Sequence, residues 1–175
     1  AGLAAALSPA NPKGPGEAPA LAQPGKLSAG WIKQIVPGEY DPGEAFVVID
    51  NHLRGDRGAY VLHTTDYGQS WSNLLAKAAI PSYAPAFVQD PVEPRLMFTG
   101  TETGLYYSLD AGQSWEHWTR GYPAVSTMDL QIHGRERDLV RATFGRGVWI
   151  IDDMQPWRDL ARSRELQEKS LHVFS

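Results

Sequence analysis

Short apolar runs separated by turn residues dominate the chain from Trp31 onward. Each run has the length of a strand and is rich in β-branched or aromatic side chains: residues 45–50 (AFVVID), 59–65, 95–101, 104–110, 139–144 and 148–152. The segments between them, such as DPGE and HGRERD, supply the Gly, Pro and Asp that tight turns favour. Strands joined by connections this short predict antiparallel meanders. The pattern therefore predicts an all-β fold.

Residues 1–30 follow a different pattern. They are dominated by Ala, Pro and Gly, and they show no sustained apolar period of either a strand or a helix. Such a stretch buries too little apolar surface to offset its ordering entropy, so we expect an extended arm or linker. A signal peptide fits less well, because the charged start and the long apolar middle are both missing.

An internal repeat predicts the architecture. The stretch LHTTDYGQSW recurs as YYSLDAGQSW, with Asp66 and Asp110 separated by 44 positions, and the preceding strands align as well. A period of about 40–45 residues with four strands per unit is typical of a propeller blade. We therefore expect a partial β-propeller of about three four-stranded antiparallel blades, near 31–77, 80–119 and 122–175.

The third unit departs from the repeat after its third strand. It begins with STMDLQIH but has no Asp-x-Gly-x-Ser-Trp after its third strand, and Pro156 is placed to open a short C-terminal helix through about Glu168. The run LHVF at 171–174 is predicted to form an outer strand. Because propellers close with typically four to eight blades, we expect a longer polypeptide or another chain to complete the ring.

The repeated motif has the chemistry of a tight turn between the third and fourth strands of a blade. Asp can accept backbone N–H bonds across the turn, Gly allows positive φ, and Trp buries a ring against the sheet. Recurrence in each full unit favours a structural role over a catalytic one. We assign this role to Thr64, Asp66, Gly68, Ser70 and Trp71, and to Ser108, Asp110, Gly112, Ser114 and Trp115.

Both copies resemble the Asp-box, or BNR repeat, of sialidases, xyloglucanases, sortilin-like receptors and photosystem assembly propellers. The segment DLVRATFGRGVWIIDD (138–153) resembles the stretch that closes the propeller of bacterial exported proteins described as sortilin-like or glycosyl-hydrolase-like. The resemblance covers roughly residues 31–174 and implies a β-propeller and an exported, periplasmic or extracellular protein. Phe144 stands where that family usually has His, so a role of that His does not transfer.

Candidate binding residues lie on the loops at the other end of the strands, opposite the repeated turns. In a propeller the loops 51–58, 101–104 and 145–147 share one face, and their side chains can converge near the axis. This selects His52, Arg54, Asp56, Glu102 and Arg146 as binding residues, with Asp50 and Arg57 beside them. The alternative is that they are solvated loop charges. For Arg146 an ion pair with Asp152 or Asp153 is a competing structural role.

Composition excludes several classes of ligand and of catalytic site. A net charge of -4 gives no electrostatic footprint for nucleic acid, and zero Cys removes thiolate nucleophiles and thiolate metal sites. No apolar run reaches the roughly 18 residues of a membrane span. The five His residues are spaced too widely for a metal-ligand pattern, so we predict no metal and no cofactor. Asp50, Asp56, Glu102 and Asp152 could supply the two carboxylates of a glycosidase, but no spacing selects a pair.

The sequence thus favours a non-catalytic propeller segment that binds or scaffolds proteins. Its expected partners are protein chains that complete or cover the propeller, with a peptide or glycan as ligand. A fragment of a sialidase- or xyloglucanase-like glycoside hydrolase is the alternative. A subunit or assembly factor of a membrane-associated complex is a third interpretation.

Overall fold

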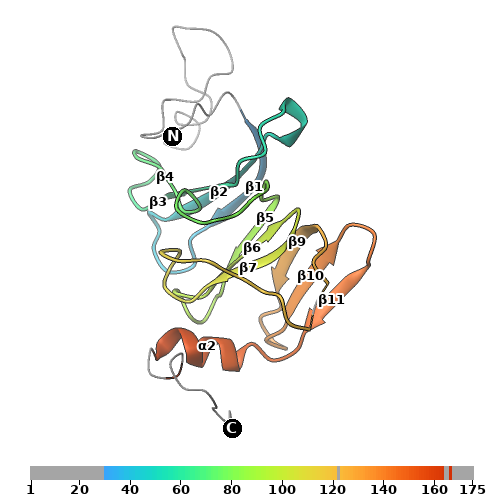
Figure 1. Cartoon of the computed structure of the whole chain (residues 1–175). Coiled ribbons are helices and arrows are strands. Elements are labelled where there is room, and N and C mark those ends of the chain that lie inside the picture. The colour runs from blue at the N-terminus through green and yellow to red at the C-terminus, as the bar shows by residue number, and fades with distance from the viewer. Residues whose placement is uncertain (1–29, 122, 164–165, 167–175) are drawn as a thin grey trace, which may run out of the picture.

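A computed structural model describes residues 30–121, 123–163 and 166 of the chain. Figure 1 shows three antiparallel sheets that follow one another along the chain, with one helix after the last sheet. Neighbouring strands in each sheet are neighbours in the sequence, as expected for meanders. The chain is therefore an all-β segment of a propeller with a short helix, as the sequence predicts.

The first two sheets each have four strands. The first consists of β1 (Trp31–Pro37), β2 (Ala45–Asp50), β3 (Tyr60–Thr64) and β4 (Ser72–Asn73), in that order. The second repeats the arrangement with β5 (Ala86–Gln89), β6 (Met97–Thr101), β7 (Gly104–Ser108) and β8 (Glu116–His117). The predicted strands of these sheets are found with ends displaced by at most two residues.

The third sheet has three strands within the described part of the chain. They are β9 (Thr127–Ile132), β10 (Leu139–Thr143) and β11 (Val148–Ile151). The fourth strand predicted at 171–174 lies outside the described residues, as do residues 1–29 of the arm predicted at 1–30. Helix α2 (Gln155–Arg162) begins with Pro156 in its first turn and stops at Ser163, whose backbone is extended. The prediction that the helix continues to Glu168 reaches residues that the structure does not describe.

Strands β2 and β3 of the first sheet are buried on both faces. In β2, Phe46 and Val48 pack toward the second sheet, whereas Val47 and Ile49 belong to a separate cluster with Leu62. Successive side chains of a strand point to opposite faces, so a continuous apolar run such as AFVVI is buried only when both faces are covered. The core between the first two sheets is closed by Phe46 and Phe87, whose ring centroids lie 4.8 Å apart.

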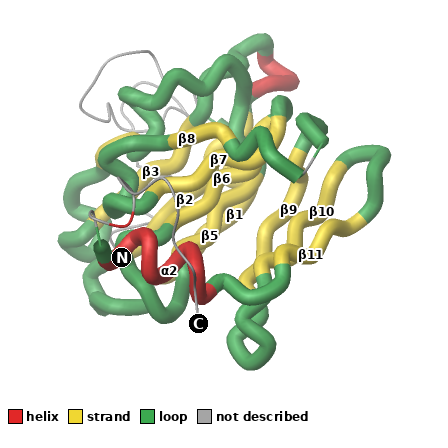
Figure 2. Tube along the Cα trace, turned by 60° about the horizontal axis from the view of Figure 1, so that its bottom comes forward, coloured by secondary structure: helices red, strands yellow, loops and turns green. Residues whose placement is uncertain are grey.

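The other face of the second sheet is covered by two elements side by side. Figures 1 and 2 show the third sheet on one side and α2 on the other. One apolar cluster joins Phe98, Leu130 and Met154 across these elements. Trp157 of α2 packs edge-on against Phe98, with centroids 6.3 Å apart, and against Tyr107 at 4.7 Å. Helix α2 therefore covers the part of the second sheet that the third sheet leaves open.

A buried ion pair fixes α2 to the β5–β6 turn. Arg158 donates from Nε to Asp90 Oδ1 at 3.0 Å and from Nη2 to Asp90 Oδ2 at 2.9 Å, and Asp90 is fully buried. Asp90 Oδ1 also accepts the backbone N–H groups of Val92 and Glu93, and so it holds the turn as well as the helix. One side chain thus links two parts of the chain that lie far apart in sequence.

Candidate functional site

The first repeated turn, between β3 and β4, is a closed network of hydrogen bonds. Ser70 donates its backbone N–H to Asp66 Oδ1 at 2.9 Å and its hydroxyl to Oδ2 at 2.6 Å, and the Thr64 hydroxyl donates to Oδ1 at 2.8 Å. Gly68, with φ at 79°, donates its N–H to Thr64 Oγ1 at 3.0 Å. The indole N–H of Trp71 donates to the Gly68 carbonyl at 3.1 Å.

The second turn, between β7 and β8, repeats each of these bonds. Asp110 accepts from the Ser114 N–H at 2.8 Å, the Ser114 hydroxyl at 2.6 Å and the Ser108 hydroxyl at 2.8 Å. Gly112, at φ 81°, donates to Ser108 Oγ, and Trp115 donates to the Gly112 carbonyl at 3.2 Å. Both aspartates therefore use their carboxylate oxygens to hold backbone and hydroxyl groups of their own turn.

These bonds lower the pKa of both aspartates. For Asp66, the Ser70 hydroxyl and then the Ser70 N–H stabilise the ionised carboxylate and lower its pKa to about 2. For Asp110, burial acts in the opposite direction, but the bonds from Ser114 and Ser108 outweigh it, so its pKa is also lowered. An ionised carboxylate of this kind holds a turn well and is a poor proton donor.

We expect the first turn to loosen only in strong acid. A carboxyl whose pKa is depressed in the folded state adds stability above its unfolded pKa, roughly 3.9 for Asp. That stability is lost as pH falls through the folded pKa of about 2. An NMR titration of the Asp66 carboxyl carbon and the Ser70 amide should show a midpoint near the lower value. In the Ser70→Ala variant the midpoint should move upward, and a wild-type midpoint near that of a free Asp would contradict the assignment.

A cluster of side chains gathers at the other end of the strands. Tyr83, in the connection from β4 to β5, stacks on His52 with ring centroids 4.2 Å apart. His52 lies in the 3-10 helix η1 (His52–Arg54) of the β2–β3 loop. The Arg57 guanidinium lies 5.9 Å from the centroid of the Tyr83 ring and forms an ion pair with Glu102 of the β6–β7 loop. We call His52, Arg57, Tyr83 and Glu102, with Asp50, the loop cluster.

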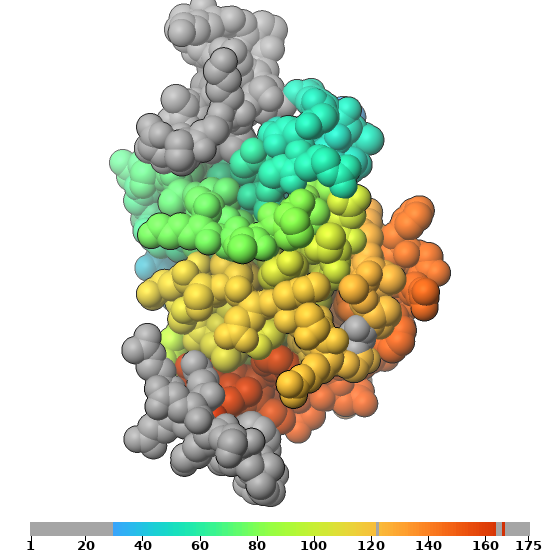
Figure 3. Space-filling model, in the orientation of Figure 1, coloured from blue at the N-terminus to red at the C-terminus, as the bar shows by residue number. Residues whose placement is uncertain are grey.

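Hydrogen bonds to the strand end and to the neighbouring connection hold the loop cluster in place. Asp50 Oδ1 accepts the backbone N–H of His52 at 3.1 Å and lies 2.5 Å from His52 Nδ1, so the imidazole is fixed against the strand end. The Glu102 N–H donates to the Tyr83 carbonyl at 3.2 Å. The β2–β3 loop stands out from the molecule at the top right of Figure 3, in cyan. The loop carries Leu53, which is 85% exposed.

Tyr83 is the member that the sequence interpretation missed. Its ring is almost fully buried among residues of the first and second sheets, and its hydroxyl bonds Ser126, just before the third sheet. Burial, followed by the charges of Glu102 and Asp50, raises the pKa of Tyr83 and keeps the phenol protonated. In a propeller, the connection from the last strand of one blade to the first strand of the next blade lies on the same face as the loop cluster. This rule is the signal that could have identified Tyr83.

The other predicted site residues are placed differently. Asp56 closes its own loop, because it accepts the Gly58 N–H at 3.0 Å and the Tyr60 hydroxyl at 3.0 Å. Arg54 is exposed beside Leu53. Arg146 is exposed on the β10–β11 loop, and it forms no ion pair with the loop cluster within the described residues.

The predicted ion pair of Arg146 with Asp152 or Asp153 is wrong within the described residues. The carboxylate of Asp153 instead accepts the N–H of Gln155 at 3.0 Å, in the first turn of α2. The carbonyl of Arg146 accepts the indole N–H of Trp149 at 3.1 Å, which turns the loop back on its own strand. Among the described residues, Asp153 is therefore bonded to the start of α2 and not to Arg146.

Both carboxylates of the loop cluster contact basic side chains: Asp50 lies against His52, and Glu102 forms an ion pair with Arg57. A glycosidase acid needs apolar surroundings that keep its proton, and an ion-paired carboxylate such as Glu102 lacks them. No group of three His, Cys, Asp or Glu side chains in the described ranges is arranged to hold a metal ion. No helix among the described residues is long and apolar enough to cross a membrane.

Comparison with known proteins supports the fold. No family model and no curated protein sequence matches the chain. Among solved structures, an ancestral GH74 enzyme matches with a TM-score of 0.53 and 16% identity, over 67% of this chain and 14% of that one. YCF48 bound to D1 peptide matches with 0.51 and 18%, over 77% and 40%. The GH74 xyloglucanase from Xanthomonas campestris matches with 0.50 and 16%, over 80% and 23%.

These are β-propeller proteins, and at such low identity the likeness shows the fold alone. The chain spans 14% to 40% of their lengths. It is therefore similar to a part of a propeller.

Proposed function

We propose that this propeller segment is a non-catalytic binding module that takes an extended stretch of polypeptide on the loop cluster. The observation that carries the proposal is the junction of His52, Tyr83 and Arg57. The partly exposed His52 stacks on the buried Tyr83, and the exposed Arg57 guanidinium and the exposed Leu53 lie on the same β2–β3 loop. Arg is one of the residue types that dominate binding energy at protein interfaces, and mounting the loop on a buried ring lowers the entropy cost of binding.

The matched structures include a protein bound to a peptide and enzymes, so they are compatible with two different functions. One of them, YCF48, is bound to a peptide. Two others are GH74 enzymes, and a hydrolase fragment is the alternative function. Polypeptide binding is favoured here because Asp50 and Glu102 are both committed to basic side chains and are not poised as an acid and a nucleophile.

Photocrosslinking tests the proposal in the intact protein. A photoreactive phenylalanine analogue at Leu53 should give adducts that proteases degrade and that mass spectrometry identifies as polypeptide. The matched control carries the same analogue at Glu136, an exposed position on the β9–β10 connection. Equal adduct yields at the two positions, or adducts degraded by glycosidases and not by proteases, would contradict the proposal.

A substitution in the loop cluster should weaken that binding. We expect Arg57→Ala to reduce affinity for a synthetic copy of the crosslinked segment by about tenfold or more, because an arginine that becomes buried on binding contributes strongly to affinity. Arg135→Ala, which removes an exposed arginine paired with Glu136, serves as the control. Isothermal titration calorimetry measures both affinities, and equal affinities of the two variants would exclude Arg57 from the binding surface.

A further inference from the structure

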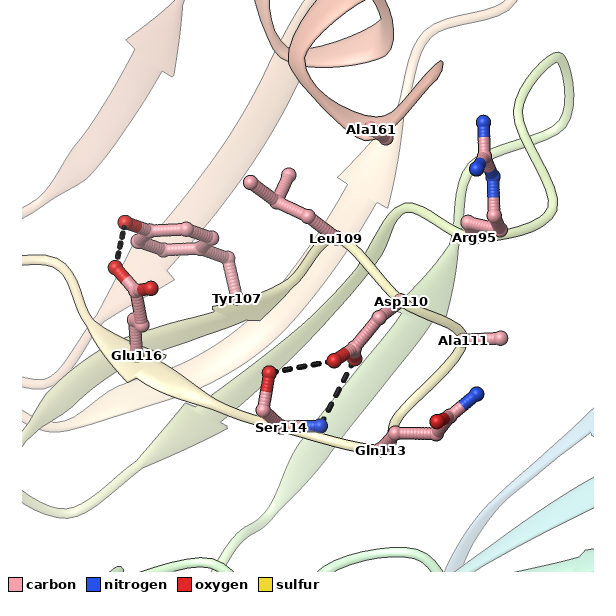
Figure 4. A pocket seen from close by; sticks show the side chains of 9 residues that line it. All are labelled: Arg95, Tyr107, Leu109, Asp110, Ala111, Gln113, Ser114, Glu116 and Ala161. Atoms are coloured by element: carbon pink, nitrogen blue, oxygen red, sulfur yellow. Dashed lines mark hydrogen bonds between the residues drawn. The ribbon is translucent and has the colours of Figure 1, made fainter. Parts of the chain in front are cut away.

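A hollow of about 430 Å³ lies at the opposite end of the second sheet from the loop cluster. Figure 4 shows it between the β7–β8 turn, β8 and the last turn of α2. Its volume is within the range of roughly 300–1,000 Å³ found for small-ligand sites. The hydrogen bonds of the β7–β8 turn do not depend on this hollow. The side chains that line the hollow indicate which ligand it could bind.

One part of the lining is apolar and rigid. Leu109 of the β7–β8 turn and Ala161 of α2 face the hollow together with the ring of Tyr107. Tyr107 is fixed from behind, because Trp157 packs against it with ring centroids 4.7 Å apart. This wall can contact an aliphatic chain without rearranging.

Another part of the lining carries negative charge. The Tyr107 hydroxyl donates to Glu116 Oε2 at 2.6 Å, and no cationic side chain among residues 30–121 and 123–163 forms an ion pair with Glu116. Asp110 adds a second ionised carboxylate. Arg95 also lines the hollow, but it is paired with Glu93 at 3.0 Å.

The hydrogen bond between Tyr107 and Glu116 keeps its direction over the physiological range. Burial, followed by the bond to Glu116, raises the pKa of Tyr107, so its hydroxyl remains the donor. Glu116 Oε1 accepts no hydrogen bond from the described residues and is available as an acceptor. The hollow therefore combines an apolar wall with an oriented, uncompensated carboxylate.

We propose that this hollow binds the side chain of an arginine or lysine from a polypeptide. The aliphatic stem would lie along Leu109 and Ala161, and the cationic head would donate to Glu116 within the field of Asp110. A neutral ligand of the same shape gains the stem contact but not the charge-assisted bond. This second site is independent of the loop cluster, which lies at the other end of the strands.

Saturation-transfer NMR on the intact protein tests the site with N-acetyl-arginine amide as the probe. N-acetyl-citrulline amide, which has a similar shape and no charge, is the matched ligand control. We expect transfer to the arginine stem, and we expect citrulline to bind about fivefold more weakly or worse, the effect of roughly 1 kcal/mol from one partly exposed ion pair. Added salt should reduce the difference. Equal binding of the two probes, or no transfer to either, would overturn the proposal.

Two variants separate charge from shape. Glu116→Gln keeps an oxygen for the Tyr107 hydroxyl, and it should remove the preference for arginine over citrulline. Glu136→Gln removes an exposed carboxylate elsewhere and should leave that preference unchanged. Ala161→Trp should fill the hollow and reduce binding of both probes, with folding checked by circular dichroism. An unchanged arginine preference in Glu116→Gln would contradict the assignment.

Discussion

Arg158→Ala is expected to lower the free energy of unfolding by about 3–5 kcal/mol, as when a buried ion pair loses one partner. Arg158 and Asp90 are 1% and 0% exposed, and the guanidinium makes bonds to both carboxylate oxygens. Removing the arginine leaves Asp90 charged inside the protein with no counterion. The same change releases α2 from the β5–β6 turn and exposes the apolar cluster beneath it.

Urea unfolding of the intact protein, followed by tryptophan fluorescence, measures this effect. The matched control is Arg162→Ala one turn further along α2, because Arg162 is partly exposed and pairs with Glu93 at 3.0 Å. That pair is worth at most about 1 kcal/mol. Asp90→Asn should destabilise more than Arg162→Ala, since it leaves Arg158 buried without its countercharge. A loss for Arg158→Ala no greater than that of the control would show that the ion pair does not hold α2.

Phe98→Ala is expected to cost about 3–5 kcal/mol, as for other large-to-small changes in a packed core. Phe98 is fully buried on β6, at the point where the second sheet meets both the third sheet and α2. Its ring contacts the edge of Trp157, so the cavity would open between three elements at once. None of these elements can close it without moving away from the others.

Graded variants at the same position test this explanation. Phe98→Leu keeps most of the apolar volume and should cost less than Phe98→Ala. Phe144→Ala is the surface control, since Phe144 is 77% exposed, and it should change stability by no more than about 0.5 kcal/mol. The same urea experiment ranks the three. If Phe98→Ala and Phe144→Ala unfold at the same urea concentration, the cluster does not anchor the third sheet and α2.

The pattern of the sequence located the features whose interactions are local. Strands β2, β3, β6 and β7 lie where apolar runs predict them, and β2 is apolar along most of its length because both of its faces are buried. The repeated turns were also readable, since every bond of Asp66 and Asp110 reaches a group at most four residues away. Side chains this close in the chain meet whenever the turn forms.

Only part of the candidate site could be predicted from the sequence. His52 and Glu102 were selected from loops that a propeller places on one face, but no local signal pairs Glu102 with Arg57, 45 residues away. Tyr83 lies in an irregular connection, and its partners come from three sheets. The predicted ion pair of Arg146 is not formed among the described residues, where Asp153 instead accepts the backbone N–H of Gln155.

The sequence by itself determined the strands, the turns and the repeat period, because hydrogen bonds within a few residues and the alternation of apolar positions encode them. The tertiary structure decided which loops meet, that α2 and the third sheet share one face of the second sheet, and that Arg158 reaches Asp90, 68 residues away. Contacts of this kind depend on how the sheets pack, and packing depends on shape complementarity between surfaces that no single stretch of sequence contains.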